Sequence, residues 1–516
     1  MTALPERARF EELQAVQQSK TLLRFIVCGS VDHGKSTLIG RLLFEAGVLF
    51  DDQLDALERD SDNPCTQGRD LDFALLLDGL AAEREQNITI DVAYRFFATA
   101  RRKFIVADTP GHEQYTRNMA TGASTADVAL LLVSASEGIT RQTRRHALIV
   151  SMLGVRQVVV AVNKMDLVGW SQSTLIALES EFRRFTDGLD VDEIVFIPVA
   201  ARSGDNVIRP SKHLSWYRGP TLLEHLERTD VRGRPHSSAF RMPIQWVNRL
   251  NAEFRGYCGL IASGELRPGA PVRLLPSGRH TQIQRIVTAD GDLAHAVAGQ
   301  CVTLTFSDDI DASRGDVVAD IAEPTTVTDR FSARLIWFDA EPLEHRRPYI
   351  LKLATATANA TIEPTLHVID LGTFKSTRTN HLGTNEIGIA VVQLDRLVAA
   401  DPYADSPLTG SFILIDRESY NTVAIGMIGA TDADNLCTRT KATLSDLIRA
   451  TETHGRSIAK ALSWRTTGSL DTFLVAAVIT GSSKVAGAVA LAEILTKTFL
   501  YYLHERIWAL IPWGKR

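Results

Sequence analysis

The sequence has little of what marks a secreted or a nucleic-acid-binding protein. Its five cysteines are scattered and form no C-x-x-C pair, which indicates reduced thiols in a cytosolic chain. There is no basic excess, because the formal net charge is −5, and this weighs against a nucleic-acid partner. Residues 1–20 are polar and charged and contain no apolar stretch, so we expect no signal peptide.

The most informative stretch that is present runs from Gly29 to Ser36, GSVDHGKS. It fits the pattern G-x-x-x-x-G-K-[ST] of a phosphate-binding loop, and it lies between a β-prone run and a run with helical spacing. Backbone N–H groups and a helix N-terminus there can hold phosphates. We expect Lys35 to reach the β- and γ-phosphates and Ser36 to ligate Mg²⁺. The other expected nucleotide-binding residues are Gly29, Ser30, Val31, Asp32, His33 and Gly34 in the loop and Thr37 directly after it.

A second motif, DTPGH, follows the predicted strand KFIVA and covers Asp108 to His112. A carboxylate at a strand end beside a phosphate loop is the expected magnesium partner, so Asp108 takes that role. The N–H of Gly111 can sense the γ-phosphate, and His112, the next residue, is the candidate that orients the attacking water. The alternative is a Pro-Gly turn with a solvated aspartate.

A third motif, NKMD, covers Asn163 to Asp166 after the strand RQVVVAV. The Asp166 carboxylate can accept hydrogen bonds from N1–H and N2–H₂ of guanine, and adenine offers no such pair, so the motif predicts GTP or GDP as the ligand. Asn163 and the Lys164 stem are expected to complete the base pocket. After a further strand, EIVFIPV, the backbone at Ala200 and Ala201 is expected to meet guanine O6.

A switch segment, EREQNITID, lies between the first two motifs at Glu83 to Asp91. Thr89 is the candidate that binds Mg²⁺ and the γ-phosphate only in the triphosphate state, so that hydrolysis would release the loop. A plain strand residue is the alternative for a threonine inside an apolar ITI run.

Together these motifs resemble the translational type of GTPase, the group of elongation factor Tu. Further stretches resemble the large, GTPase subunit of bacterial ATP sulfurylase, or sulfate adenylyltransferase, over roughly Ser19 to Ile428. Two positions depart from that family's pattern: Asn87 stands where the switch usually has Gly, and Ala200 stands where Ser is common. The stretches that carry the resemblance are RNMATGAST, QTRRHALIVSMLGV, WYRGPTLLEHLE, QWVNRLNAEFRGYCG and DIDASRGDV.

The resemblance implies a heterodimer. A small catalytic subunit adenylylates sulfate with ATP, and GTP hydrolysis on the large subunit drives that uphill step. The sequence contains no SGG-x-D-S loop, no HxGH motif and no second phosphate-binding loop, so we expect the adenylylation chemistry in the partner chain. The alternatives are a translation-factor-like GTPase that delivers a special aminoacyl-tRNA and a membrane-bound regulatory GTPase.

The chain of 516 residues is long enough for several domains. We expect a multidomain α/β + β fold: an N-terminal extension at 1–20, a GTP-binding domain with a mostly parallel sheet at 21–238, β-barrels at 239–327 and 328–434, and a helical segment at 435–516.

The C-terminal segment holds two apolar runs flanked by basic residues. The first run, Ser469 to Ser483, is shorter than the ~20 residues of a spanning helix, and the second contains Glu493 and Lys497. The segment resembles a small bacterial membrane-protein family of unknown function. Three alternatives stay open: a hairpin that tethers the cytoplasmic GTPase to the inner membrane, a soluble helical pair, and an interfacial amphipathic hairpin.

Overall fold

The computed structural model describes residues 20–48, 73, 89–230, 239–249, 254–323, 325–371, 376–379 and 381–429. Most of the predicted N-terminal extension, the switch segment before Thr89 and the predicted C-terminal segment lie outside these residues. The chain divides into two units, Met1–Thr431 and Asp432–Arg516. Within the described part, no helix is long and apolar enough to cross a membrane.

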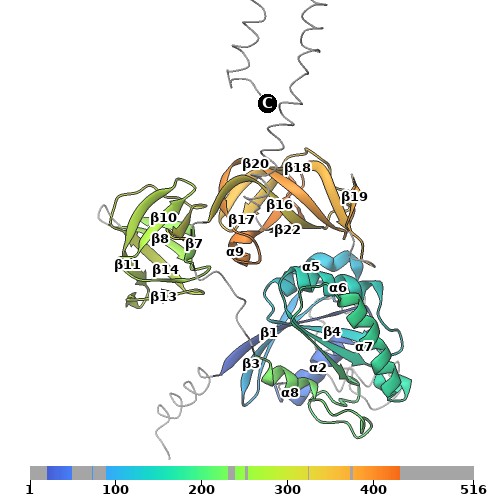
Figure 1. Cartoon of the computed structure of the whole chain (residues 1–516). Helices are drawn as coiled ribbons and strands as arrows, with labels where there is room; N and C mark the ends of the chain where they lie inside the picture. Colours follow the sequence, from blue (N-terminus) through green and yellow to red (C-terminus); the bar gives the residue numbers. More distant parts are fainter. Residues whose placement is uncertain are drawn as a thin grey trace, which may run out of the picture. The chain divides into compact units, whose positions relative to one another are not determined.

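The first domain contains a six-stranded sheet with the order β2-β3-β1-β4-β5-β6. Figure 1 labels β1, β3 and β4 of this sheet. All neighbouring strands are parallel except β2 and β3. This confirms the predicted mostly parallel sheet with flanking helices. Its elements are β1 (Thr21–Gly29), α2 (Lys35–Glu45), β2 (Ala93–Ala98), β3 (Arg102–Asp108), α5 (Thr116–Ser124), β4 (Val128–Ser134), α6 (Arg141–Met152), β5 (Gln157–Asn163), α7 (Gln172–Thr186), β6 (Glu193–Pro198) and α8 (Leu222–Arg228).

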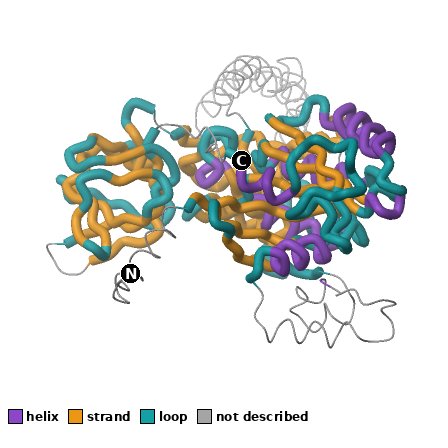
Figure 2. Tube along the Cα trace, turned by 90° about the horizontal axis from the view of Figure 1, so that it is seen from below, coloured by secondary structure: helices purple, strands orange, loops and turns teal. Residues whose placement is uncertain are grey.

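Helices cover both faces of this sheet, which explains its nearly continuous apolar strands. Along β1 the side chains alternate: Phe25 and Val27 pack with α2 and α8, whereas Ile26 and Cys28 pack with α5 and α6. Every residue of β4 is buried. The helices lie to both sides of the strands in Figure 2. Because helices cover both faces of the sheet, a ligand can reach it at the ends of the strands.

Two antiparallel β-barrels follow, as the turn-rich middle of the sequence predicts. We call them barrel 2 and barrel 3, because they are the second and third domains of the chain. In barrel 2, the strand order β10-β15-β7-β8-β14-β11 closes through pairing of β10 with β11. In barrel 3, the strand order β17-β21-β22-β16-β20-β18 closes through pairing of β17 with β18. The elements of barrel 2 are β7 (Arg241–Arg249), β8 (Arg255–Leu260), β9 (Glu265–Leu266), β10 (Pro271–Leu275), β11 (Arg279–Thr288), β12 (Gly291–Asp292), β13 (Ala296–Val297), β14 (Cys301–Phe306) and β15 (Val317–Asp320). Those of barrel 3 are β16 (Thr326–Trp337), β17 (Tyr349–Leu353), β18 (Ala356–Ile369), β19 (Ser376–Thr379), β20 (Ile387–Ala400), α9 (Pro407–Gly410), β21 (Ser411–Ile415) and β22 (Thr422–Ile428).

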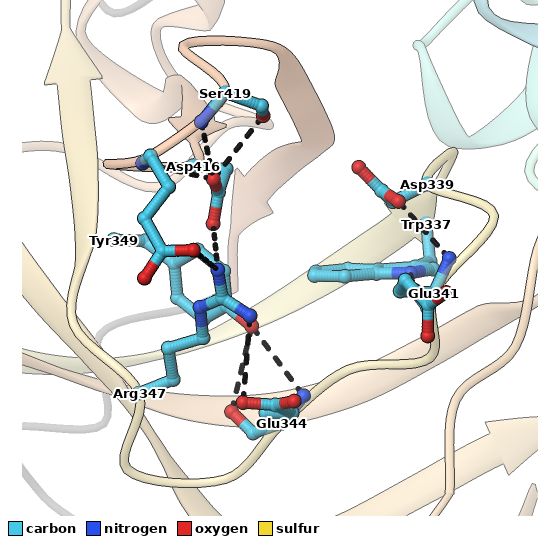
Figure 3. Close-up of polar contacts among 9 residues, drawn as sticks. Trp337, Asp339, Glu341, Glu344, Arg347, Tyr349, Asp416 and Ser419 are labelled. Atoms are coloured by element: carbon cyan, nitrogen blue, oxygen red, sulfur yellow. Dashed lines mark hydrogen bonds and ion pairs between the residues drawn. The ribbon is translucent and has the colours of Figure 1, made fainter.

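One end of barrel 3 is fixed by polar contacts that Figure 3 shows. The Arg347 guanidinium lies 2.7 Å from Asp416 Oδ2, and the Ser419 N–H donates to Asp416 Oδ1 at 2.8 Å. These backbone and side-chain donors hold the pKa of Asp416 below its usual range. Nearby, the Trp337 indole N–H donates to the carbonyl of Glu341 at 2.8 Å, which holds the loop after β16. The barrel therefore has a well-anchored end at Trp337.

A buried ion pair joins the two barrels. Arg241, at the start of β7, places Nε 3.3 Å from Asp401 Oδ2 of barrel 3, and the side chains are only 5% and 9% exposed. The Thr409 hydroxyl donates to the same carboxylate at 2.6 Å. Each of these two buried charges neutralises the other, so removing one leaves the other as an uncompensated charge in the interior.

We therefore expect Asp401→Ala to destabilise the barrels strongly, by about 3 kcal/mol or more, because it leaves a buried guanidinium unpaired. The measurement is the midpoint of urea-induced unfolding of the full chain. The control is Asp292→Ala, which breaks the exposed pair with Arg285, and it should leave the midpoint in place. Equal midpoints for both variants would show that the buried pair does not hold the barrels.

Candidate functional site

The predicted motifs meet at one edge of the sheet. The phosphate loop follows β1, DTPGH follows β3, NKMD follows β5, and Ala200 and Ala201 come shortly after β6. These strands are parallel, so their carboxyl ends lie together, which is where open α/β sheets bind ligands.

The phosphate loop has a backbone that depends on glycine. Gly29 and Gly34 have φ values of 147° and 88°, in the region that side chains rarely adopt. A Cβ on Gly34 would meet the Asn163 amide nitrogen at 2.6 Å. Helix α2 begins directly after this turn, so Ser36 and Thr37 lie in its first turn, half-buried. The loop and helix N-terminus thus have the form that holds phosphates.

Lys35 and the DTPGH motif converge at this loop. The Lys35 ammonium donates to the carbonyls of Gly29 at 3.2 Å and Ser30 at 2.8 Å. Burial lowers the pKa of Lys35, and the charge of Asp108 opposes that shift. A Cβ on Gly111 would meet the Lys35 ammonium and would lie 2.9 Å from the Val31 nitrogen. Gly111 therefore lies against the phosphate loop, and the role of its N–H as γ-phosphate sensor stays a prediction.

Asp108 itself is 1% exposed. The neighbouring Thr109 hydroxyl donates to the Val27 carbonyl at 2.7 Å and ties this strand end to β1. His112 follows, half-buried, and begins a short 3-10 turn at Glu113–Tyr115. The structure thus places the magnesium candidate inside and the water-orienting candidate at the boundary with solvent.

The Asn163 amide joins two of the motifs. Its Nδ2 donates to the His33 carbonyl at 2.8 Å, and its Oδ1 accepts from the Ala201 N–H at 2.9 Å. Both contacts are buried. The N–H that sequence analysis assigns to guanine O6 thus donates to Asn163 in this structure, and the assignment stays a prediction.

The rest of NKMD is held in a tight turn. Lys164 has a positive φ of 61°, and its ammonium lies 3.7 Å from Glu137 Oε1. Glu137 also approaches His33, whose Nε2 lies 3.4 Å from Oε2, while burial lowers the pKa of His33. Asp166 is exposed, so its carboxylate is accessible to a base.

His146 belongs to none of the predicted nucleotide-binding motifs; it lies on α6 and is fully buried. Its Nδ1 accepts from the Gly29 N–H at 3.0 Å and fixes the first residue of the phosphate loop. Burial lowers the pKa of His146 to about 3, and the charges of Lys35 and Arg145 act in the same direction. The ring is therefore neutral at physiological pH. No local pattern distinguishes this histidine from one that faces solvent.

The structure leaves the switch only partly described. Thr89 is half-buried, and the next residue, Ile90, accepts a hydrogen bond from the Asn118 amide at 2.7 Å. Residues 83–88 of the predicted switch lie outside the described residues. The donor types at the loop, the Ser36 hydroxyl and the Asp108 carboxylate, are hard oxygen ligands of the kind Mg²⁺ takes alongside phosphates. The residues present therefore fit a magnesium nucleotide.

Comparisons with known proteins agree with this geometry. Residues 20–231 match the family described as Elongation factor Tu GTP binding domain, residues 330–429 match GTP-eEF1A C-terminal domain-like, and residues 458–509 match Predicted membrane protein. The chain is 53% identical to Sulfate adenylyltransferase subunit 1 of Methylorubrum populi, over 82% of this chain and 90% of that protein. It is 52% identical to the protein of that name in Aeromonas salmonicida, over 83% and 90%. It is 51% identical to the Bifunctional enzyme NodQ of a Rhizobium species, over 80% of this chain and 64% of that protein.

The buried neutral His146 predicts a specific dependence of stability on pH. An unfolded histidine titrates near 6.5, and the folded ring binds its proton only near 3, so the unfolded state gains protons first as the pH falls. Between pH 7 and 5 this one group should cost the fold about 2 kcal/mol. His146→Asn can keep the acceptor for Gly29 and should lose correspondingly less over that interval. Urea unfolding at both pH values tests this, and parallel losses in the two proteins would contradict it.

Proposed function

The chain belongs to the family of sulfate adenylyltransferase subunit 1, and from this premise we propose how its own residues bind and hydrolyse GTP to drive sulfate activation. It is the GTP-hydrolysing subunit of a heteromeric sulfate adenylyltransferase. The convergence of Gly111 on Lys35 within the phosphate loop carries the residue-level proposal, because hydrolysis needs a sensor and a phosphate ligand at the same phosphate.

Phosphate binding is assigned to the loop and its helix. The N–H groups of Gly29 to Ser36 and the Lys35 ammonium bind the phosphates and offset their charge. Ser36, Asp108 and Thr89 are the residues that would hold Mg²⁺, which supplies further charge neutralisation when bound. His112 then orients the attacking water, since it directly follows the γ-phosphate sensor Gly111.

Guanine selection is assigned to NKMD. The exposed Asp166 carboxylate accepts from N1–H and N2–H₂, and the Lys164 stem lies along the base. Asn163 acts indirectly, because its amide already holds the phosphate loop to the Ala201 loop. Because Asn163 positions the phosphate loop and the Ala201 loop together, it would couple recognition of the base to binding of the phosphates.

The partner we propose is a small catalytic subunit that forms adenosine 5′-phosphosulfate and pyrophosphate from ATP and sulfate. This chain then supplies the GTPase motor and its barrels supply the contact surface. The alternative of a GTPase that delivers a special aminoacyl-tRNA is disfavoured, because the relatives that match four-fifths of the chain include proteins named as sulfate adenylyltransferase subunits.

For the C-terminal segment we propose a membrane tether. Residues 458–509 resemble a family described as membrane proteins, and basic residues flank the apolar runs. Such flanks favour the cytoplasmic side, which would place the GTPase on the cytoplasmic face of the inner membrane.

Pyrophosphate release tests the function. With the co-purified small subunit, ATP and sulfate, GTP should raise the rate of pyrophosphate release severalfold. His112→Ala should abolish this stimulation and lower kcat for GTP about a hundredfold or more while changing KM little, because water is oriented only in the reaction. Asp166→Asn should shift the stimulation from GTP toward XTP, whose base carries an oxygen where guanine carries N2–H₂.

Two outcomes would overturn parts of this proposal. If GTP leaves pyrophosphate release by the wild-type complex unchanged, the coupling to sulfate activation is wrong. If the Asp166→Asn variant keeps the wild-type preference for GTP over XTP, the base pocket is misassigned. The His112→Ala variant serves as the matched control for nucleotide binding, because its affinity for GTP should remain.

Sedimentation tests the tether. The full chain expressed with its partner should pellet with membranes, resist a high-salt wash and dissolve in detergent, because the apolar runs rather than surface charge would hold it. A chain ending at residue 434 should remain in the supernatant. Recovery of the full-length protein in the supernatant without detergent would exclude the tether.

A further inference from the structure

Barrel 3 contacts the loop that carries His112. The Asn385 side-chain amide, between β19 and β20, donates to the Glu113 carbonyl at 2.9 Å. Glu113 is the residue after His112. Barrel 3 also packs on the GTP-binding domain through apolar side chains, since Ile336 and Ile387 belong to the same buried cluster as residues of α5 and α6. The hydrogen bond is partly buried: Asn385 is buried, whereas the Glu113 side chain is 56% exposed.

Glu113 is also held by side chains of the GTP-binding domain, called the G domain below. The Arg145 guanidinium, on α6, donates to Glu113 Oε1 at 2.5 Å, and the Thr116 hydroxyl donates to the Glu113 carbonyl at 2.6 Å. The carbonyl and the carboxylate of one residue thus receive hydrogen bonds from three different side chains. Such a residue has little freedom to change its backbone angles, and the His112 backbone is directly bonded to it.

Arg145 is an unusual residue for this place because its side chain is only 2% exposed. A guanidinium stays charged at any physiological pH, so burying it requires a partner of opposite charge. Glu113 is that partner, and Gln142 Oε1 accepts a second hydrogen bond from Arg145 at 2.8 Å. The need to neutralise Arg145 therefore draws Glu113 toward α6.

Asn385 is itself fixed. It is 5% exposed and has a positive φ of 61°, a conformation that asparagine tolerates better than most residues. Its own N–H donates to the Trp337 carbonyl at 2.7 Å, and Trp337 belongs to the anchored end of barrel 3 that Figure 3 shows. The amide therefore points at Glu113 from a rigid support.

We propose that Arg145, Glu113 and Asn385 form a positioning cluster that sets the location of His112, so that barrel 3 contributes directly to the rate of GTP hydrolysis. Arg145 and Asn385 are positioning residues, because they act on His112 through Glu113 and do not touch the nucleotide loop themselves. Docked barrel 3 completes the cluster, and undocked barrel 3 leaves Glu113 with the G-domain contacts alone. This inference rests on the proposed role of His112.

The test measures kcat and KM for GTP hydrolysis by the full chain with its partner subunit. Asn385→Gly deletes the amide and keeps the backbone angle, since glycine accepts positive φ. It should lower kcat about tenfold with KM within about twofold, because small displacements of a catalytic group reduce rate more than binding. Glu113→Ala should do the same, and Glu113→Gln, which keeps an acceptor for Arg145, should recover part of the rate.

Tyr403→Phe is the matched control. Tyr403 also joins barrel 3 to the G domain, through a hydrogen bond of 3.0 Å from its hydroxyl to the Leu153 carbonyl at the far end of α6. Losing it should leave kcat within about twofold. In addition, the double variant Glu113→Ala with Asn385→Gly should lose less kcat than the product of the two single losses, because both substitutions act on one loop.

The outcomes distinguish a failure of the positioning cluster from a failure of the proposed role of His112 in GTP hydrolysis. If the wild-type complex hydrolyses GTP and Asn385→Gly behaves like Tyr403→Phe, the positioning cluster is wrong and the GTPase assignment stands. Changes confined to KM, or single effects that multiply fully, also overturn the cluster. If instead His112→Ala hydrolyses GTP at the wild-type rate, the role of His112 itself fails.

Discussion

The site depends on the hydrogen bonds of one buried amide. Asn163, at the end of β5, binds the carbonyl of His33 and the N–H of Ala201, and so joins the ends of three strands. The bridge links the phosphate loop to the base-side loop, and Arg41 of α2 adds a second link by donating to the Ala201 carbonyl at 3.2 Å. A buried polar group of this kind stabilises the fold only when all its partners are present. The same contacts that satisfy the amide therefore fix the spacing between the phosphate and base ends of the pocket.

Local motifs carried most of the prediction. GSVDHGKS, DTPGH and NKMD lie at strand ends in the expected order, and the parallel sheet that they imply is present. These motifs are predictable because each depends on its own few residues and on backbone geometry. The two barrels also follow from local turn signals.

Contacts between distant segments could not be predicted in this way. Glu113 and Asn385 are separated by 272 positions, and nothing near either residue specifies the other. Arg145 and His146 lie on a helix whose pattern does not tell which charged residue points inward. Their burial follows from packing of α6 against the sheet and barrel 3, which is a property of the assembled chain. The Ala201 N–H shows that a motif does not reveal every local partner, because this group donates to Asn163 within the protein.

Barrel 3 reaches α6 at two places, directly at Leu153 through Tyr403 and indirectly at Arg145 through Asn385 and Glu113. Eight residues of helix separate Arg145 from Leu153, which is about 12 Å of a stiff rod. If barrel 3 tilts about its contact at Leu153, Asn385 is displaced relative to Arg145 while Tyr403 stays in place. The buried Arg241–Asp401 pair couples barrel 2 to the same movement. A protein that binds either barrel would thus displace the loop that carries His112, without any change inside the nucleotide pocket.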